Sequence, residues 1–279
     1  MCISTKPSRM SDTTIYAGHA RLDDKFVHVL GYQNTADNLH DGPNAMILPL
    51  PTRVPVSQKN VIDVSGLDNL MKDFRDAIEP ATKGGNYRGF LGDDMRKSKA
   101  IVFDSGAYTV VLAQDAMDIP EALKRVPENK RPEANMELFK EFRVMYPNWP
   151  VAVCCYDGSI KTTPMFWWFE PIYPGMLFAP ALDAHNGKPP DLDVEVGVDH
   201  MLVFGSTMLA AAGNTVPYSK EPSQELFSFL PKKVVGTSVR GSLLNGDFWY
   251  PADKIGREYK VRSYLRRLQP TEIQEFRGH

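Results

Sequence analysis

The chain has 279 residues, of which 43% are hydrophobic and 24% charged, and its formal net charge is −2. These are ordinary globular values for a chain that buries a sizeable core, and the near-neutral charge gives no indication of a nucleic-acid or membrane-surface partner. Its three cysteines, two of them adjacent, do not form a disulfide framework, and no apolar run is long enough for a signal peptide or a membrane span, so we expect a reducing, cytoplasmic compartment.

Extended segments dominate the first fifty residues. Alternating side chains predict strands over Thr13–His19 and Lys25–Gly31, and the short turn Leu22–Asp24 between them predicts a hairpin. A third extended run covers Asn44–Leu50, and prolines at 49, 51 and 55 end it.

Helical spacing first appears after these prolines. Ser65 is a candidate N-cap for a helix that ends before Pro80, and Leu67, Leu70 and Phe74 lie on its apolar face. A strand-like segment then covers 100–113 and is interrupted at 104–106. Further helices are predicted over 120–126, 132–146 and 221–230.

The middle of the chain is its most hydrophobic part. Apolar strands are predicted over 151–156, 165–170, 176–181 and 199–205, and a long β segment over 232–250. Within that segment, Asn245-Gly246-Asp247 predicts a hairpin, and basic helical turns are expected over 261–268 and 271–277. We therefore predict one α+β domain over 1–279, with a mixed, mainly antiparallel sheet core, layered αββα or sandwich-like, and flanking helices.

The second residue is the strongest indication of chemistry. Cys2 follows the initiator methionine and is small enough to allow its removal, which would leave a free α-amine beside a thiol. The amine could then take the thiol proton, and the thiolate could attack a carbonyl. A cysteine that stands at this position by chance is the alternative.

A thiolate of this kind needs a cation, an orienting acid and a donor for the oxyanion. Arg21 and Arg240 are the candidate cations, and Asp24 is the candidate acid. Asn214 or Asn34 is the candidate oxyanion donor. The structural alternative for Arg21 and Asp24 is a charged, exposed hairpin turn.

The order of these residues resembles the choloylglycine hydrolase branch of the N-terminal nucleophile hydrolases. Members of that family begin Met-Cys, continue into a Tyr-x-Gly segment and then Arg-x-x-Asp. Here the matching residues are Cys2, Tyr16-Ala17-Gly18 and Arg21-Leu22-Asp23-Asp24, with Arg240 in Thr237-Ser238-Val239-Arg240 as the late arginine. The insertion of His19-Ala20 departs from the family pattern. The resemblance implies an αββα fold and hydrolysis of a linear amide, such as an acylated amino acid.

Three other groups of residues have a structural and a functional interpretation. Asp183, His185, Asp199 and His200 could hold a divalent metal, or could be a polar turn and a strand-edge histidine; we predict no metal and no cofactor. The aromatic runs 165–173 and 248–250 could bind a partner or lie in a strand buried on both faces. The glycine-rich run 83–89 could be a lid or a surface loop, and Cys154-Cys155 is expected to be buried.

Two hypotheses follow from the sequence. The first is a cysteine N-terminal nucleophile hydrolase acting on an amide substrate through Cys2, Arg21, Asp24, Asn214 and Arg240. The second is a non-catalytic, β-rich binding or assembly protein whose exposed aromatic and proline-rich loops contact a protein partner. We expect no nucleic-acid or membrane partner, and the sequence leaves homo-oligomerisation open.

Overall fold

The computed structural model describes residues 3–79, 100–158, 160–161, 163–209, 213–256 and 260–275, and the fold below is that of these residues. The helices are α1 (Leu70–Ile78), α2 (Ile119–Leu123), α3 (Met136–Met145), α4 (Val261–Tyr264) and α5 (Pro270–Glu275). The strands are β1 (Ile3–Ser4), β2 (Ser8–Leu22), β3 (Lys25–Asn38), β4 (Pro43–Pro49), β5 (Ala100–Ser105), β6 (Tyr108–Ala113), β7 (Val151–Asp157), β8 (Ile160–Lys161), β9 (Met165–Phe169), β10 (Met176–Ala179), β11 (Glu195–Ser206), β12 (Asn214–Thr215), β13 (Lys233–Leu244), β14 (Asp247–Pro251) and β15 (Arg266–Leu268).

The strands form three sheets. A seven-stranded sheet has the order β12-β13-β11-β2-β3-β8, and β9 also pairs with β3. A five-stranded sheet has the order β1-β4-β7-β6-β5, and a three-stranded sheet has the order β10-β14-β15. Every pairing between two of these strands is antiparallel except that of β2 with β11. The predicted α+β class with a mixed, mainly antiparallel sheet core is therefore confirmed.

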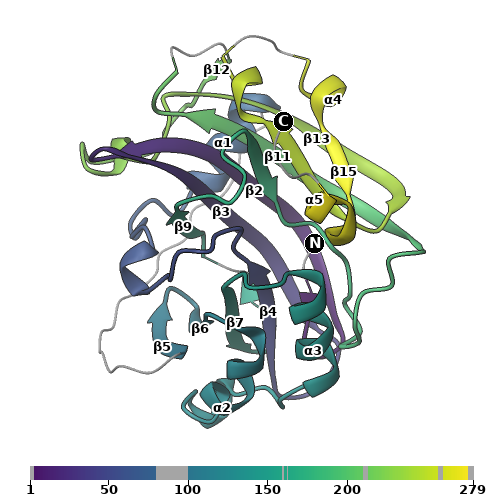
Figure 1. Cartoon of the computed structure of the whole chain (residues 1–279). Coiled ribbons are helices and arrows are strands. Elements are labelled where there is room, and N and C mark those ends of the chain that lie inside the picture. The colour runs from purple at the N-terminus through teal and green to yellow at the C-terminus, as the bar shows by residue number, and fades with distance from the viewer. Residues whose placement is uncertain are drawn as a thin grey trace.

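The elements stack in an α, β, β, α order. Helix α1 covers the outer face of the seven-stranded sheet, where the Phe74 ring lies 4.8 Å from the ring of Tyr16. Helices α2 and α3 cover the outer face of the five-stranded sheet, and Phe139 and Phe142 of α3 join Val153 of β7 in one buried cluster. Figure 1 shows α2 and α3 beside β4 and β7 at one end of the molecule, with the long β2–β3 hairpin crossing its middle.

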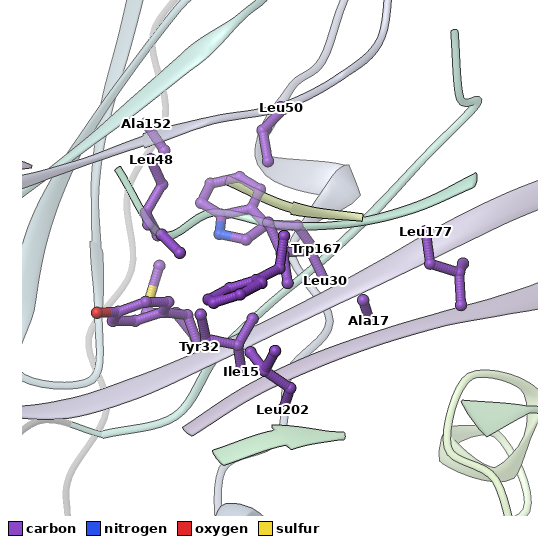
Figure 2. Packing of buried hydrophobic residues seen from close by; sticks show 14 of the residues in the cluster. Ile15, Ala17, Leu30, Tyr32, Leu48, Leu50, Ala152, Trp167, Leu177 and Leu202 are labelled. Carbon is purple, nitrogen blue, oxygen red and sulfur yellow. The ribbon is translucent and has the colours of Figure 1, made fainter. Parts of the chain in front are cut away.

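The central core lies between the sheets. Leu30 and Trp167 of the seven-stranded sheet, Leu48 of the five-stranded sheet and Leu177 of the three-stranded sheet belong to one buried cluster. Figure 2 shows Trp167 near the middle of the labelled residues of this cluster, with Leu177 to one side. Because alternate strand residues point to opposite faces, neighbours such as Cys154 and Cys155 of β7 supply two different clusters.

The hairpin predicted in the first forty residues is present and longer than expected. β2 and β3 pair from Leu22 opposite Lys25 to Ser8 opposite Asn38, with a register shift between Ser11 and Thr14. Asp12 lies at that shift with a φ of 52°, a conformation that aspartate tolerates better than most side chains. The hairpin places its turn at one end of the sheet and the start of the chain at the other.

Some helix predictions need correction. Helix α1 begins at Leu70 with Asn69 as its N-cap, while Ser65 lies in a preceding turn and donates its backbone N–H to Asp63 Oδ1 at 2.9 Å. The helix predicted over 221–230 is wrong: the described helical structure there is one 3-10 turn, Leu226–Ser228, and prolines at 222 and 231 flank it. The expected helical turns over 261–268 divide into α4 and the strand β15.

The hairpin predicted at Asn245-Gly246-Asp247 is also wrong. β13 pairs with β11 and β12, whereas β14 pairs with β10 and β15, so the chain passes from one sheet to another at this point. The side chains of Asn245 and Asp247 are buried and hold a different segment, residues 181–183, instead of closing a two-residue turn.

Candidate functional site

The residues predicted from the sequence do not form one site among the described residues. Cys2 lies outside the described residues. Arg21 and Asp24 lie at the exposed turn between β2 and β3, where Arg21 Nη2 is 3.8 Å from Asp24 Oδ1 and their side chains are 63% and 105% exposed. This arrangement is that of a solvated ion pair on a hairpin turn, which contributes little to stability.

Arg240 lies at the other end of the same sheet. It pairs with Asp199 of β11, and β11 in turn pairs with β2 from Met201 opposite Thr14 to Ser206 opposite His19. Arg21 is therefore about nine strand residues from the level of Arg240, which corresponds to about 30 Å. These two arginines cannot stabilise the same thiolate.

The two candidate oxyanion donors already have partners. Asn214 donates its Nδ2 to the carbonyl oxygen of Ala77 at 2.6 Å, at the end of α1. Asn34 is buried between the sheets and donates its Nδ2 to Met10 Sδ at 3.2 Å. Each amide therefore has a structural role in this conformation.

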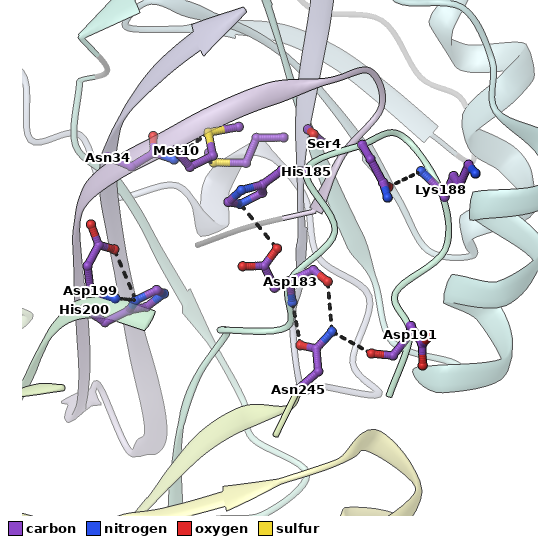
Figure 3. Close-up of polar contacts among 12 residues, drawn as sticks. Ser4, Met10, Asn34, Asp183, His185, Lys188, Asp191, Asp199, His200 and Asn245 are labelled. Carbon is purple, nitrogen blue, oxygen red and sulfur yellow. Dashed lines mark hydrogen bonds and ion pairs between the residues drawn. The ribbon is translucent and has the colours of Figure 1, made fainter. Parts of the chain in front are cut away.

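A buried polar cluster lies where the chain begins. The backbone N–H of Ser4 donates to the carbonyl oxygen of Ala184 at 3.0 Å, and Ile3 forms a parallel bridge with Ala184. Asp183 precedes this residue and its side chain is 16% exposed. Figure 3 shows Asp183 between His185 and Asn245, with Asp199 and His200 nearby on β11. The first described residues of the chain therefore run alongside this cluster.

Two side chains from the β13–β14 connection hold the backbone of this cluster. Asn245 accepts from the backbone N–H of Asp183 at 2.8 Å and donates back to its carbonyl oxygen at 2.9 Å. Asp247 Oδ1 accepts from the backbone N–H groups of Ala181 and Leu182 at 2.7 and 3.0 Å, and its Oδ2 accepts from the hydroxyl of Tyr146 at 2.5 Å. The position of Asp183 is thus fixed by buried hydrogen bonds on both sides.

The charges in the cluster are poorly solvated. Burial raises the pKa of Asp183 from its ordinary value of 3.8 to about 6, partly offset by the positive charge of Arg267. Arg267 donates its Nε to the carbonyl oxygen of Leu244 at 2.6 Å, and its guanidinium lies 4.6 Å from the centre of the Phe248 ring. Both Nη atoms of Arg267 are buried without a hydrogen-bond partner among the described residues. A carboxyl that titrates near neutral pH and a guanidinium with unused donors are features of functional sites.

The histidines of this region do not complete a metal site. His185 Nε2 lies 3.8 Å from Asp183 Oδ1, and His200 Nδ1 lies 3.7 Å from Asp199 Oδ1. The backbone N–H of Asp199 donates to His200 Nδ1, and burial lowers the pKa of His200 well below its ordinary value, so this imidazole is neutral. No group of three or more His, Cys, Asp or Glu side chains in the described part of the chain is arranged to hold a metal ion.

The aromatic runs are buried. Phe166, Trp167 and Trp249 are at most 1% exposed, and they pack on both faces of their strands. Trp168 is half-buried and donates its Nε1 to the carbonyl oxygen of Lys59 at 3.0 Å. The described aromatic strands therefore give no support to an exposed aromatic docking surface.

The adjacent cysteines and the glycine-rich run are the remaining features that the sequence analysis singled out. Cys154 and Cys155 are buried, and burial raises the pKa of the Cys155 thiol to about 12, so neither is a reactive thiol in the folded protein. The glycine-rich run 83–89 lies outside the described residues. None of the helices in the described ranges is both long and apolar enough to cross a membrane.

Sequence reasoning missed the residues that hold the cluster. The sequence pattern predicts a turn at Asn245 and Asp247, and a basic helical turn at Arg267. The available signal was chemical: polar residues directly flanking the apolar run 248–250 are candidates for buried hydrogen-bonding roles.

Comparison with protein-family models, curated proteins and solved structures finds no match to this chain.

Proposed function

We propose that this protein is a cysteine N-terminal nucleophile hydrolase that cleaves a linear acyl-amide bond, with Asp183 and Arg267 as the groups that assist Cys2. The supporting observation is the place where the described chain begins. Ile3 bridges Ala184, beside a buried carboxyl and a buried, partly unsatisfied guanidinium. Cys2 directly precedes Ile3 in the sequence.

In this mechanism the chain must first lose Met1. The α-amine of Cys2 then takes the thiol proton, and the thiolate attacks the amide carbonyl to give a tetrahedral intermediate. The unused Nη donors of Arg267 stabilise its oxyanion. The protonated α-amine donates its proton to the leaving amine, which leaves a thioester on Cys2. Water, with the α-amine as base, hydrolyses that thioester and releases the carboxylic acid.

The role of Asp183 is to orient the α-amine of Cys2 and set its protonation state. A carboxylate close to an ammonium group raises the pKa of that amine, whereas a neutral carboxyl does not. Because Asp183 titrates near pH 6, its charge changes within the range in which the amine must act as a base. Arg21, Asp24, Asn214 and Arg240 have no part in this revised site.

The test begins with the intact mass of the protein purified from its native host, which must lack one methionine. Hydrolysis is then assayed on acyl p-nitroanilides of increasing chain length. We expect Cys2→Ala to abolish turnover and Asp183→Asn to lower kcat/KM about 100-fold, a loss typical of a group that acts on proton transfer. Asp24→Asn is the matched control, because its carboxylate is 105% exposed at the distant β2–β3 turn and its loss should leave turnover unchanged.

Thiol labelling gives an independent readout. Cys154 and Cys155 are buried, so iodoacetamide applied to the folded protein reports on Cys2 alone. The pH dependence of that labelling should shift in Asp183→Asn and remain unchanged in Asp24→Asn. Retention of Met1, or acyl-amide turnover that survives Cys2→Ala, would overturn the proposal.

A further inference from the structure

A polar groove lies on the outer edge of β13, far from the turn that carries Arg21. Its volume is about 430 Å³, within the range of small-molecule sites. The groove continues from the end of α1 along β13 to α4. The residues that line it are Ile78, Glu79, Gly236, Thr237, Ser238, Arg240 and Arg262.

The groove follows a strand edge that is largely unpaired. On its outer side, β13 pairs with β12 at Val234 and Lys233, and no other described strand pairs there. Arg262 of α4 partly covers this edge: its Nη2 donates to the carbonyl oxygen of Ser238 at 2.7 Å and its Nε to Thr237 Oγ1 at 3.3 Å. These bonds hold one guanidinium at the groove in a fixed orientation.

The second guanidinium has no polar partner in the part of the chain that the structure describes. Arg240 is exposed and has no hydrogen bond or ion pair with any described residue. It pairs across the sheet with Asp199, whereas Val239 pairs with His200. Alternate residues of a strand point to opposite faces, so Arg240 lies on the face opposite His200 and the buried polar cluster. The groove is therefore separate from the proposed hydrolase site.

The residues that line the groove indicate which class of ligand it could bind. Two arginines and two hydroxyl side chains stand against one carboxylate, Glu79, and Ile78 is the main apolar contact. Guanidinium groups recognise phosphate and carboxylate oxygens with paired hydrogen bonds. The described lining residues include no aromatic ring on which a base could stack. We propose that this groove binds a small polyanion through a phosphate or carboxylate group, with Arg240 as the principal contact.

Calorimetric titration with inorganic pyrophosphate and with citrate, at constant ionic strength set by sodium chloride, tests this. We expect saturable binding at one site per chain, and Arg240→Gln should weaken it about tenfold or more. Arg262→Gln should also weaken binding, with its fold checked by circular dichroism because Arg262 supports the strand edge. Arg21→Gln, a change to another exposed arginine at the distant turn, should leave binding as in the unmodified protein.

The two probes distinguish the ligand classes. Binding of pyrophosphate alone assigns the groove to phosphate compounds, and binding of citrate alone assigns it to carboxylates. The proposal is overturned if neither anion saturates the protein below about 10 mM, or if Arg240→Gln binds as tightly as the unmodified protein. Because the assay measures binding alone, its result does not depend on whether Cys2 is catalytic.

Discussion

At the scale of single residues, Asp247 shows how much one buried carboxylate can organise. It accepts hydrogen bonds from two backbone N–H groups and from Tyr146 in a position that is 2% exposed. All three donors lose their partner if the carboxylate is removed, and each buried, unsatisfied donor costs about 1–3 kcal/mol. The residue therefore carries more stability than its single side chain suggests.

We expect Asp247→Ala to lower the free energy of unfolding by about 3 kcal/mol or more. Tyr146→Phe is the matched control, because it removes one donor and leaves the two backbone bonds in place, and it should cost about 1 kcal/mol. Urea denaturation followed by circular dichroism measures both. Equal losses in the two variants would show that the backbone bonds contribute nothing.

The burial of one histidine, His28, predicts how the free energy of unfolding falls at acid pH. His28 is 2% exposed, its Nε2 lies 3.2 Å from the carbonyl oxygen of Pro174, and burial lowers its pKa from 6.5 to about 3. Because the folded-state pKa lies below the unfolded value, the stabilisation is complete above pH 6.5 and is lost as the pH falls towards 3. Over that window His28 should reduce the free energy of unfolding by about 1.4 kcal/mol per pH unit.

The measurement compares unfolding free energies of the unmodified protein and His28→Phe between pH 7 and pH 4. The difference between the two curves isolates His28 from Asp183, whose raised pKa acts in the opposite direction between 3.8 and about 6. The acid slope should become shallower in His28→Phe, where His200, whose pKa burial also lowers, still contributes, and it should be unchanged in His40→Gln, a histidine in the turn after β3. A slope unchanged in His28→Phe would assign the acid limb to other groups.

At the scale of elements, close packing between neighbouring strands sets which positions must be glycine. Gly31 of β3 pairs with Phe166 of β9, and a Cβ at Gly31 would lie 2.5 and 2.6 Å from carbons of the Phe166 ring. That ring also packs against Phe74 of α1, with centroids 6.4 Å apart, so it has little room to move. The glycine allows a helix, a ring and a strand to stack at one point.

Gly31→Ala should therefore destabilise the protein by about 1–3 kcal/mol, the range for overpacked cores. Gly197→Ala in β11 is the control, because a Cβ there meets nothing within 4 Å and its φ is not positive, so its effect should be small. Thermal unfolding of the two variants compares them directly. Stability equal to that of the unmodified protein in Gly31→Ala would show that the Phe166 ring can yield.

Local patterns predicted elements well where the information is local. The β2–β3 hairpin follows from alternation of apolar residues and a short charged turn, and both are visible in adjacent residues. The error at Asn245-Gly246 has a non-local cause. Asn245 and Asp247 bond to residues 181–183, more than sixty positions earlier, and these bonds direct the chain into another sheet. No pattern within the turn itself contains that information.

The candidate site illustrates the same limit. The sequence identified Cys2, Asp183 and His200 as chemically interesting, but it grouped Cys2 with Arg21 and Arg240, which lie at opposite ends of one sheet. Arg267 was assigned to a basic helical turn because its neighbours are charged, yet it lies in the strand β15 with its guanidinium over Phe248. Which charges meet depends on sheet order, and sheet order is set by the whole core.

At the scale of the whole molecule, single strands contribute residues to two different core clusters, one on each face. β7 supplies Cys154 to the central cluster and Cys155 to the cluster under α3, and β2 supplies Ile15 to the central cluster and Tyr16 to the cluster under α1. One strand cannot lose its contacts on one face while it keeps a regular register on the other. The three clusters are therefore coupled through the sheets that separate them.

From this coupling we predict that the chain unfolds as one cooperative domain. Phe74→Leu in α1 and Phe142→Leu in α3 remove core volume from opposite outer layers. Each should lower the free energy of unfolding by about 1 kcal/mol, and the protein should still unfold in a single transition. Differential scanning calorimetry should give equal calorimetric and van't Hoff enthalpies for both variants. If instead each substitution moved a separate transition and left the other in place, the layers would be independent, and the residues of 1–279 would form more than one folding unit.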